Sequence, residues 1–200
     1  CSESGCGAWG VNEIMRSLRM TDMAHLLLAH VVKEGDTVID ATAGNGHDTV
    51  FLAQRVGDSG KVHAFDIQRQ AIENTRRRLE EWRLSHRVVL HHASHTNIAY
   101  MDSSIKATVF NLGYLPGSDK QIVTQAESTR AAVSAALPLL QPSGIVVLVQ
   151  YRGHPGGEQE AAALEQFVRQ LPSSAYVVSK YEHLNVPHNP PYVLVIEKRR

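Results

Sequence analysis

Residues 38–50 read Val-Ile-Asp-Ala-Thr-Ala-Gly-Asn-Gly-His-Asp-Thr-Val, and this stretch decides the fold. A short apolar strand over residues 37–41 leads into a Gly44-Asn45-Gly46 turn, and a helix begins near His47. Glycines let the backbone approach a ligand closely, and the helix N-terminus behind them favours negative charge. A dinucleotide fingerprint needs glycine or alanine where Thr49 stands, and a P-loop needs a Gly-Lys-Ser/Thr sequence that is absent. The turn therefore indicates a nucleoside ligand that lacks a pyrophosphate.

An acidic residue follows at the place where a ribose would bind. Asp66 ends a second apolar strand, predicted over residues 61–66. A carboxylate at this position accepts hydrogen bonds from both hydroxyls of a ribose. The alternative is that Asp66 caps the helix that we predict over residues 68–83.

Strands and helices alternate along the rest of the chain. The other predicted strands are 87–91, 107–112, 144–150, 175–181 and 192–198, and the other helices are 21–32, 47–56, 124–140 and 157–171. Apolar strands interleaved with helices indicate a mostly parallel seven-stranded sheet with helices on both faces. The link between the last two strands is too short for a right-handed crossover, so the last strand should run antiparallel to its neighbour.

Apolar spacing also predicts which helix faces point inward. In the helix over 21–32 we expect an inner row of Met23, Leu26, Leu27 and His30. In the helix over 68–83 we expect Ile72, Leu79 and Trp82 to face the core.

Composition limits the classes of function. The chain has 200 residues, a hydrophobic fraction of 43%, and 20 basic against 20 acidic side chains, so its formal net charge is zero. We expect one α/β domain over residues 21–200 after an N-terminal extension, residues 1–20, that faces RNA. The charge balance argues against a broad basic coat for nucleic acid but leaves room for a local basic patch.

The positions of cysteine, histidine and apolar residues bear on metal binding and on cellular location. The cysteines, Cys1 and Cys6, lie together near the start, and the eleven histidines show no metal-ligand spacing, so we expect no metal site. No apolar run is long enough to span a membrane, and residues 1–10 lack the apolar core of a signal peptide. We therefore expect a cytoplasmic protein.

Several segments carry a resemblance to a known family. The D-A-T-A-G-N-G-H and F-D-I-Q segments resemble the first two motifs of class I S-adenosylmethionine-dependent methyltransferases, which have a Rossmann-like domain. F-N-L-G-Y-L-P-G-x-D-K, Y-x-G-H-P-G-G and N-P-P-Y are similar to the bacterial family of putative rRNA methylases, also described as tRNA 5-aminomethyl-2-thiouridine methyltransferases. The similarity extends from about residue 21 to residue 198. It implies methyl transfer from S-adenosylmethionine to the primary amine of 5-aminomethyl-2-thiouridine at wobble position 34, with the tRNA anticodon stem-loop as partner.

The resemblance also implies the cofactor site. Its residues would lie near the ends of the first three strands: Asp40, Gly44, Asn45, Gly46, Asp48, Asp66, Gln68, Ser94 and His95. Those of the glycine turn, with Asp48, would surround the methionine end, and Ser94 and His95 would contact the adenine. The alternative roles are stabilisation of the helix dipole for Asp48 and an ordinary surface or core position for His95.

Candidate catalytic residues follow the fourth and fifth strands. Asn111 ends the fourth strand, where amino-methyltransferases often carry Asn/Asp-Pro-Pro-Tyr, and Asn111-Leu112-Gly113-Tyr114 retains the Asn and the aromatic residue. Asn111 would orient the amine, while Tyr114 or His154 would position or deprotonate it. The alternative for His154 is that Gly-His-Pro-Gly-Gly merely shapes a tight loop. The literal Asn-Pro-Pro-Tyr at residues 189–192 precedes the last strand, and we interpret it as a rigid loop.

Lys120, Tyr151 and Arg152 are the residues that we expect to contact RNA. They follow the fourth and fifth strands, beside the expected methyl site, and Tyr151 offers a ring on which a splayed base can stack. No separate RNA-binding domain is visible, so the catalytic domain or a homodimer of it would read the anticodon stem. Two alternatives stay open: a methyltransferase of the same fold that acts on rRNA or a small molecule, and a cofactor-binding module without activity.

Overall fold

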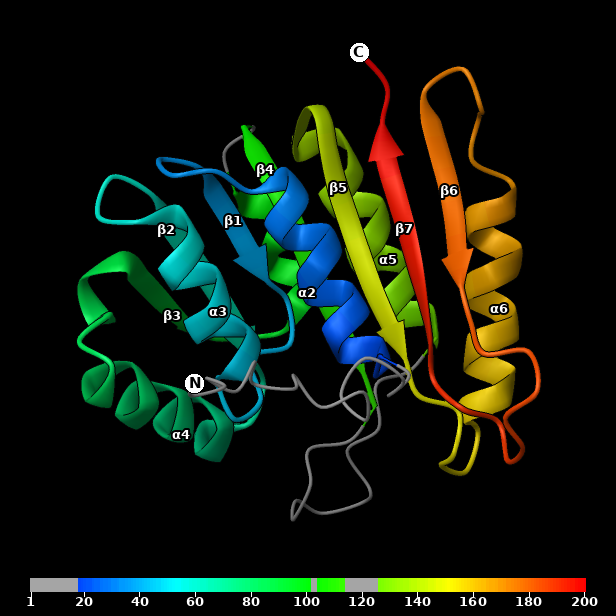
Figure 1. Ribbon diagram of the computed structural model, residues 1–200, viewed down its shortest axis with the longest axis horizontal. Coiled ribbons are helices and arrows are strands. Elements are labelled where there is room, and N and C mark those ends of the chain that lie inside the picture. Colours follow the sequence, from blue (N-terminus) through cyan, green and yellow to red (C-terminus); the bar gives the residue numbers. More distant parts are fainter. Residues whose placement is uncertain (1–17, 102–103, 114–125) are drawn as a thin grey trace, which may run out of the picture.

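The computed structural model describes residues 18–101, 104–113 and 126–200. Figure 1 shows a single seven-stranded sheet with the strand order β3-β2-β1-β4-β5-β7-β6. Its strands are β1 (Thr37–Asp40), β2 (Lys61–Asp66), β3 (Val88–His92), β4 (Ile105–Leu112), β5 (Leu140–Gln150), β6 (Tyr176–Tyr181) and β7 (Tyr192–Lys198). The helices are α2 (Met20–Val31), α3 (His47–Val56), α4 (Arg69–Glu81), α5 (Ala126–Ala136) and α6 (Gly157–Arg169), with short 3-10 turns η1 (Ser85–Arg87), η2 (His95–Tyr100) and η3 (Leu137–Leu139).

The strand directions confirm the predicted sheet. β3, β2, β1, β4 and β5 pair in parallel, whereas β7 pairs antiparallel with both β5 and β6. β6 and β7 are consecutive strands joined without a helix, as the short link between them requires. The fold is therefore Rossmann-like, and β7, the last strand of the chain, is inserted antiparallel between β5 and β6.

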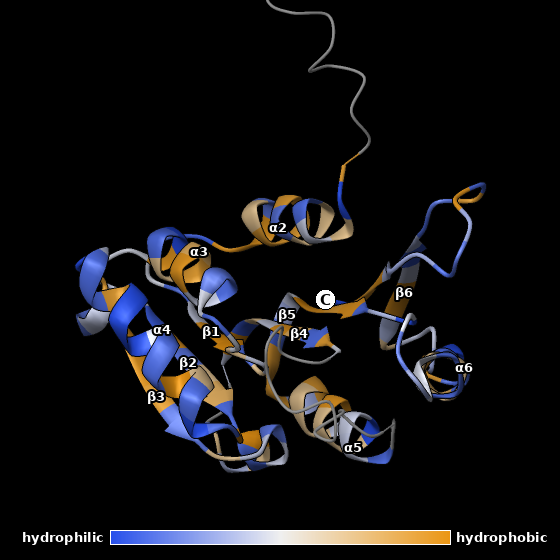
Figure 2. Ribbon diagram, turned by 90° about the horizontal axis from the view of Figure 1, so that it is seen from below, coloured by the Kyte–Doolittle hydropathy of each residue, from blue (hydrophilic) through white to orange (hydrophobic). Residues whose placement is uncertain are grey.

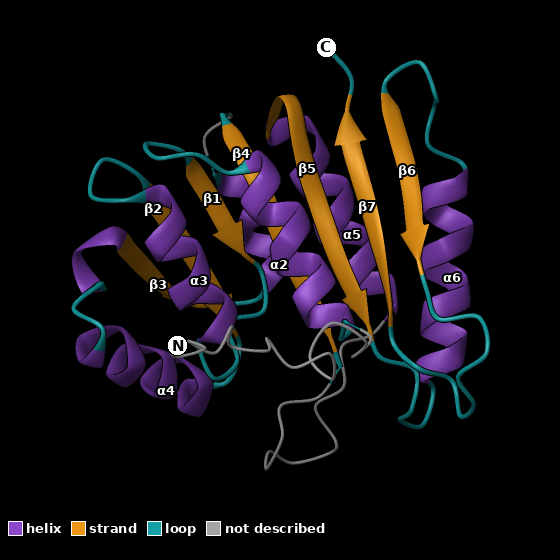
Figure 3. Cartoon of the chain, in the orientation of Figure 1, coloured by secondary structure: helices purple, strands orange, loops and turns teal. Residues whose placement is uncertain are grey.

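Helices cover both faces of the sheet, as Figures 2 and 3 show. One apolar cluster joins α2, α3 and α4 to alternate strand residues such as Val38, Val62 and Val147. A second cluster joins α5 and α6 to the opposite face through residues such as Ile39 and Phe110. Side chains alternate between the faces of a strand, so β1, β2, β4, β5 and β7 each contribute to both clusters.

Two predicted helix faces are confirmed only in part: Met23 and Leu27 pack against the core and Ile72 and Leu79 are buried, but Leu26, His30 and Trp82 do not face inward. In α2 the buried row is Met20, Ala24 and Leu28, while Leu26 is 55% exposed and His30 is also exposed. These buried residues are four apart and form a narrow stripe that packs on the sheet. Trp82 is 56% exposed because α4 ends at Glu81 and the chain turns away through Arg83, whose φ is 55°.

The two largest differences from the predicted boundaries lie at the end of α5 and the start of β5. Within the described residues α5 ends at Ala136, and Pro138 lies in the 3-10 turn that follows it. β5 begins at Leu140 rather than at residue 144, because Leu140 already pairs with Ile105 across a register shift in β4. None of the helices in the described ranges is long and apolar enough to cross a membrane.

The topology brings several polar strand ends to one edge. β1, β2, β4 and β5 are parallel, so their carboxyl ends lie on the same side of the sheet. Asp40, Asp66, Asn111 and Tyr151 lie at or next to these ends. In open α/β sheets ligands bind at this edge, where the strand order reverses. Here the reversal occurs between β1 and β4.

Candidate active site

The glycine turn between β1 and α3 is held by α4. Gly44 and Gly46 have φ values of 55° and 84°, in the left-handed region that favours glycine. A Cβ added to Gly46 would lie 3.0 Å from Thr75 Cα, so α4 also packs too closely for a side chain there. Thr75 Oγ1 donates to Gly44 O over 3.1 Å, and Arg78 Nε donates to Asn45 O over 2.8 Å. We call this turn the glycine cradle: its left-handed backbone is held by α4, which fills the space that a side chain at Gly46 would need.

Asp66 links this turn to the start of α4. Its Oδ2 accepts a hydrogen bond from Gly44 N at 3.0 Å, and its Oδ1 accepts one from Gln68 N at 2.8 Å. Gln68 is the residue that precedes the first turn of α4, so Asp66 does not occupy the cap position itself. Each carboxylate oxygen has two lone pairs, so Asp66 retains acceptor capacity for ribose hydroxyls.

An apolar side chain lies beside this carboxylate, and the sequence reasoning missed it. Ile67 is exposed between Asp66 and Gln68, and its backbone oxygen accepts a hydrogen bond from His92 Nε2 at 3.0 Å. An exposed isoleucine next to a carboxylate that keeps free acceptor capacity offers an apolar surface on which a base could pack. Its signal in the sequence is an apolar residue placed directly after the acid that ends a strand.

Asp40 supports the turn from beneath. It is fully buried, and its carboxylate accepts hydrogen bonds from Thr42 N at 3.1 Å and from Thr49 Oγ1 at 2.6 Å. Burial, and then the nearby charge of Asp48, raises the pKa of Asp40 to about 7. The contacts of Asp40 therefore join β1 to α3.

Asp48 connects α2, α3 and β4 through its two carboxylate oxygens. Oδ1 lies 2.6 Å from His25 Nε2 of α2, and Oδ2 accepts a hydrogen bond from Asn111 Nδ2 at 3.0 Å. The Asn111 backbone N donates to Thr42 Oγ1 over 2.7 Å, which ties β4 to the loop after β1. The His25 ring stacks on Phe51, with centroids 4.0 Å apart and planes 5° apart. Asp48 thus holds the amide of Asn111 at the end of β4.

Tyr151 lies beside this group. Its backbone N donates to Leu112 O over 3.0 Å, and its ring lies so close to Gly113 that an added Cβ there would be 3.3 Å from it. Burial, and then the negative charge of Asp48, raises the pKa of Tyr151, whereas Arg19 opposes the shift. The hydroxyl is therefore neutral near pH 7. The structure brings Asn111 and Asp48 into direct contact beside Tyr151, and it adds His25; the sequence reasoning predicted neither the Asp48–Asn111 contact nor a role for His25.

His154, Ser94 and His95 have partners of their own. His154 is buried, with Nε2 3.5 Å from Glu160 Oε2 in α6. Burial raises the pKa of Glu160, while His154 opposes the shift. Ser94 Oγ caps η2 by accepting from Thr96 N at 3.2 Å. The rings of His95 and Phe110 meet edge to face, with their centroids 5.9 Å apart. Burial lowers the pKa of His95.

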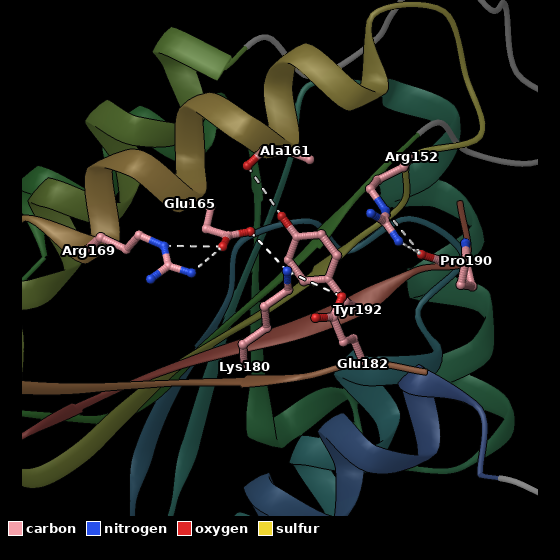
Figure 4. Close-up of polar contacts among 8 residues, drawn as sticks. All are labelled: Arg152, Ala161, Glu165, Arg169, Lys180, Glu182, Pro190 and Tyr192. Carbon is pink, nitrogen blue, oxygen red and sulfur yellow. Dashed lines mark hydrogen bonds and ion pairs between the residues drawn. The ribbon is translucent and has the colours of Figure 1, made fainter. Parts of the chain in front are cut away.

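Arg152 is engaged by the Asn-Pro-Pro-Tyr segment, as Figure 4 shows. Its guanidinium donates to Pro190 O from Nε at 3.1 Å and from Nη2 at 2.7 Å, and it lies 5.1 Å from the centre of the Tyr192 ring. The Tyr192 hydroxyl donates to Ala161 O over 3.3 Å. Residues 188–191 form a loop before β7, as predicted, and His188 and Asn189 in it have positive φ.

Two candidate residues, Tyr114 and Lys120, lie outside the described residues. Within the described ranges, no three His, Cys, Asp or Glu side chains gather as a metal site. The arrangement at the strand ends therefore combines the glycine cradle, an acid with free acceptor capacity, and an oriented amide near a half-buried tyrosine. These are groups suited to bind a nucleoside and to hold an amine by hydrogen bonds.

Comparison with known proteins gives matches over most of the chain. The family model described as "Putative rRNA methylase" matches residues 62–197, and a model of protein-L-isoaspartate(D-aspartate) O-methyltransferase matches residues 8–104. A chloroplastic tRNA (mnm(5)s(2)U34)-methyltransferase of Arabidopsis thaliana is 38% identical over 191 residues, which cover 90% of this chain and 70% of the relative.

Solved structures that resemble this chain are also described as methyltransferases. One described as a putative rRNA-methylase from Clostridium thermocellum is 40% identical, with a TM-score of 0.89 over 92% of this chain and 100% of that chain. A methyltransferase from Streptococcus mutans, solved in complex with SAH, is 36% identical, with a TM-score of 0.83 over 92% of this chain and 99% of that chain.

Proposed function

Since the chain belongs to the putative rRNA methylase family, we propose that it methylates the aminomethyl group of 5-aminomethyl-2-thiouridine at position 34 of tRNA. It is an S-adenosylmethionine-dependent methyltransferase, in line with the SAH complex of the Streptococcus mutans relative. The tRNA substrate is inferred from the Arabidopsis relative, whose name gives mnm(5)s(2)U34, the methylated form of this nucleoside.

The residues of the cradle fit this cofactor. The turn at Gly44 and Gly46, whose left-handed backbone is held by α4, would lie against the methionine end of the cofactor. Asp66 offers acceptors to ribose hydroxyls, and exposed Ile67 offers an apolar contact to the adenine. Gln68, Ser94 and His95 are the remaining proposed contacts to the adenosine. The cofactor, when bound, supplies a methyl group on a positively charged sulfur that a lone pair can attack.

Asn111 is the residue that we propose orients the amine. A carboxylate accepts hydrogen bonds and donates none, so the amide nitrogen of Asn111 must face Asp48. The carbonyl oxygen Oδ1 then faces away from Asp48, and no donor from the described ranges reaches it. An amine that donates one N–H to Oδ1 has its lone pair held in a defined direction, which in-line methyl transfer requires. This oriented amide is the observation that carries the proposal.

The substrate amine must lose a proton before the attack, because a protonated amine has no lone pair. The attack of the neutral amine then gives the methylated product as an ammonium group. Proton release to water is the route that we favour. His154, the other candidate base, is buried and paired with Glu160. Tyr151 retains its proton near pH 7, so it serves as a hydrogen-bond donor or a stacking surface rather than as a base. Tyr114 and Lys120 remain proposed substrate contacts.

Substrate choice is tested with the purified chain, labelled S-adenosylmethionine, and tRNA or rRNA from cells that lack the chain. We expect label in tRNA only, with the product nucleoside identified by mass spectrometry as 5-methylaminomethyl-2-thiouridine. Label in rRNA or in a small molecule would instead support a methyltransferase of the same fold that acts on rRNA or on a small molecule. Cofactor binding by calorimetry without transfer to any substrate would support a module without activity.

Asn111→Ala is the sharpest single variant for this proposal. We expect turnover to fall about 100-fold because the amine loses its orientation, while affinity for S-adenosylmethionine stays within about twofold. Asn97→Ala is a matched control, since Asn97 is exposed in η2 and its backbone N bonds to Ser94 O. Wild-type turnover in Asn111→Ala would remove Asn111 from the mechanism.

Three further expectations rest on the sequence. We propose that residues 1–20 form an extension that faces the RNA and that residues 21–200 form the catalytic domain. A cytoplasmic location and a homodimer are predictions as well, and the Arabidopsis relative is chloroplastic. Gel filtration with light scattering measures the oligomeric state directly.

A further inference from the structure

Two helices and one strand, which are distant in sequence, meet at Asp48. The contacts join His25 in α2, Asp48 in the first turn of α3 and Asn111 at the end of β4. The side chain of His25 is 30% exposed and that of Asp48 is 12% exposed, so the series runs from the surface into the site. The cofactor and amine contacts proposed above include Asp48 and Asn111 but leave His25 without a role.

We infer that His25 and Asp48 are positioning residues that act through Asn111, an inference that rests on the proposed function. His25 holds one oxygen of Asp48 at 2.6 Å, and the other oxygen holds Asn111 Nδ2 at 3.0 Å. The pair thereby selects the amide orientation in which the Asn111 carbonyl faces the amine. In the flipped orientation the NH2 group would face the amine and would compete for its lone pair.

The contacts around His25 explain why this residue can set the geometry. Its ring lies parallel to Phe51 at 4.0 Å, so Phe51, one helical turn after Asp48 in sequence, limits rotation of the imidazole. A carboxylate with two fixed hydrogen-bond partners has one orientation, whereas a carboxylate with one partner can rotate. Without His25, Asp48 is free to turn away from Asn111.

The side-chain amide of Asn111 reports on this geometry directly. In ¹⁵N-labelled protein, the Asn111 Nδ2 protons are assigned by their loss in Asn111→Ala. We expect the proton bonded to Asp48 to exchange with solvent at least about tenfold faster in Asp48→Ala and in His25→Phe. His25→Phe keeps a ring that stacks on Phe51 but lacks Nε2. His30→Phe makes the same replacement at an exposed position of α2 and should leave the exchange unchanged.

Turnover separates positioning from a structural role. We expect kcat to fall about 10- to 100-fold in Asp48→Ala and by a smaller factor in His25→Phe, with little change in KM for tRNA. Asp48→Asn should retain most of the activity, because its carbonyl accepts from Asn111 while its amide donates to His25. Equal losses in Asp48→Asn and Asp48→Ala would assign the effect to charge and overturn the positioning role.

The two measurements also distinguish this inference from the proposed function. A wild-type chain that methylates no tRNA contradicts the proposed function, and the amide exchange then still decides whether His25 and Asp48 hold Asn111. If exchange in Asp48→Ala and His25→Phe equals that of the wild type, the inference is wrong even when tRNA is methylated.

Discussion

Replacing the buried acid beneath the glycine turn should remove a pH dependence from the stability of the fold. The change is Asp40→Asn, which keeps the size and shape of the side chain. The new carbonyl still accepts from Thr42 N, and the new amide group donates to the Thr49 hydroxyl, which has free lone pairs. The variant therefore loses the charge of Asp40 but keeps both of its hydrogen-bonded neighbours.

The magnitude follows from the raised pKa. The Asp40 carboxyl titrates near 7 in the folded chain, whereas an aspartate in the unfolded chain titrates near 3.9, so the folded state holds an extra proton between these values. A group whose pKa is raised on folding in this way favours the folded state at low pH and disfavours it as the pH rises. Between about pH 5 and about pH 8 the wild type should lose about 2 to 3 kcal/mol of unfolding free energy from this group alone.

Urea unfolding followed by circular dichroism at several pH values measures this effect. The difference between the wild-type and Asp40→Asn curves isolates Asp40, because half-buried histidines such as His63 and His91 titrate in both proteins. We expect the variant to gain stability relative to the wild type as the pH rises from about 5 to about 8. Parallel curves for the two proteins would refute the idea that burial raises the pKa of Asp40.

Three further predictions concern single contacts. Gly46→Ala should lower the unfolding free energy by about 1 to 2 kcal/mol and weaken cofactor binding, because φ at Gly46 is 84° and Thr75 Cα lies 3.0 Å from the added Cβ. The assay is thermal denaturation. Gly153→Ala is its control, because the added Cβ there has no atom within 4 Å. Tyr192→Phe should cost about 1 kcal/mol in urea unfolding, because Ala161 O loses its donor while the buried ring remains, and an unchanged stability would show that this bond contributes nothing. Burial lowers the pKa of His91, so its contribution to stability is present above about pH 6.5 and is lost as the pH falls; His91→Gln should reduce the acid sensitivity in the same assay, and an equal loss in both proteins would contradict it.

Local sequence patterns predicted the framework of the site. The bounds of α3, β2 and β7 agree with the predicted ranges, and the antiparallel last strand follows from one short link. The glycine turn and Asp66 were recognised because glycine conformation and strand ends leave local marks in a sequence. The parallel order then placed Asn111 and Asp48 at the same edge.

Contacts between distant elements were not predictable in the same way. Spacing along α2 directed attention to His30, whereas His25 is the histidine that reaches Asp48. The RNA contact expected for Arg152 stays a prediction, and nothing in the sequence indicated that its guanidinium contacts Pro190 and Tyr192, 38 and 40 positions further along the chain. Neither contact has a signal in the local pattern of residues.

The sequence by itself determined the order of strands and helices, the position of the turn and the acid that follows it. These features depend on interactions within a few residues, such as the left-handed φ of Gly46 and the alternation of apolar side chains. Only the tertiary structure decided which side chains meet: His25 with Asp48, Asp48 with Asn111, and Arg152 with Pro190. The physical reason is that these pairs form where helices dock on the sheet, and the docking angle and register depend on the whole core.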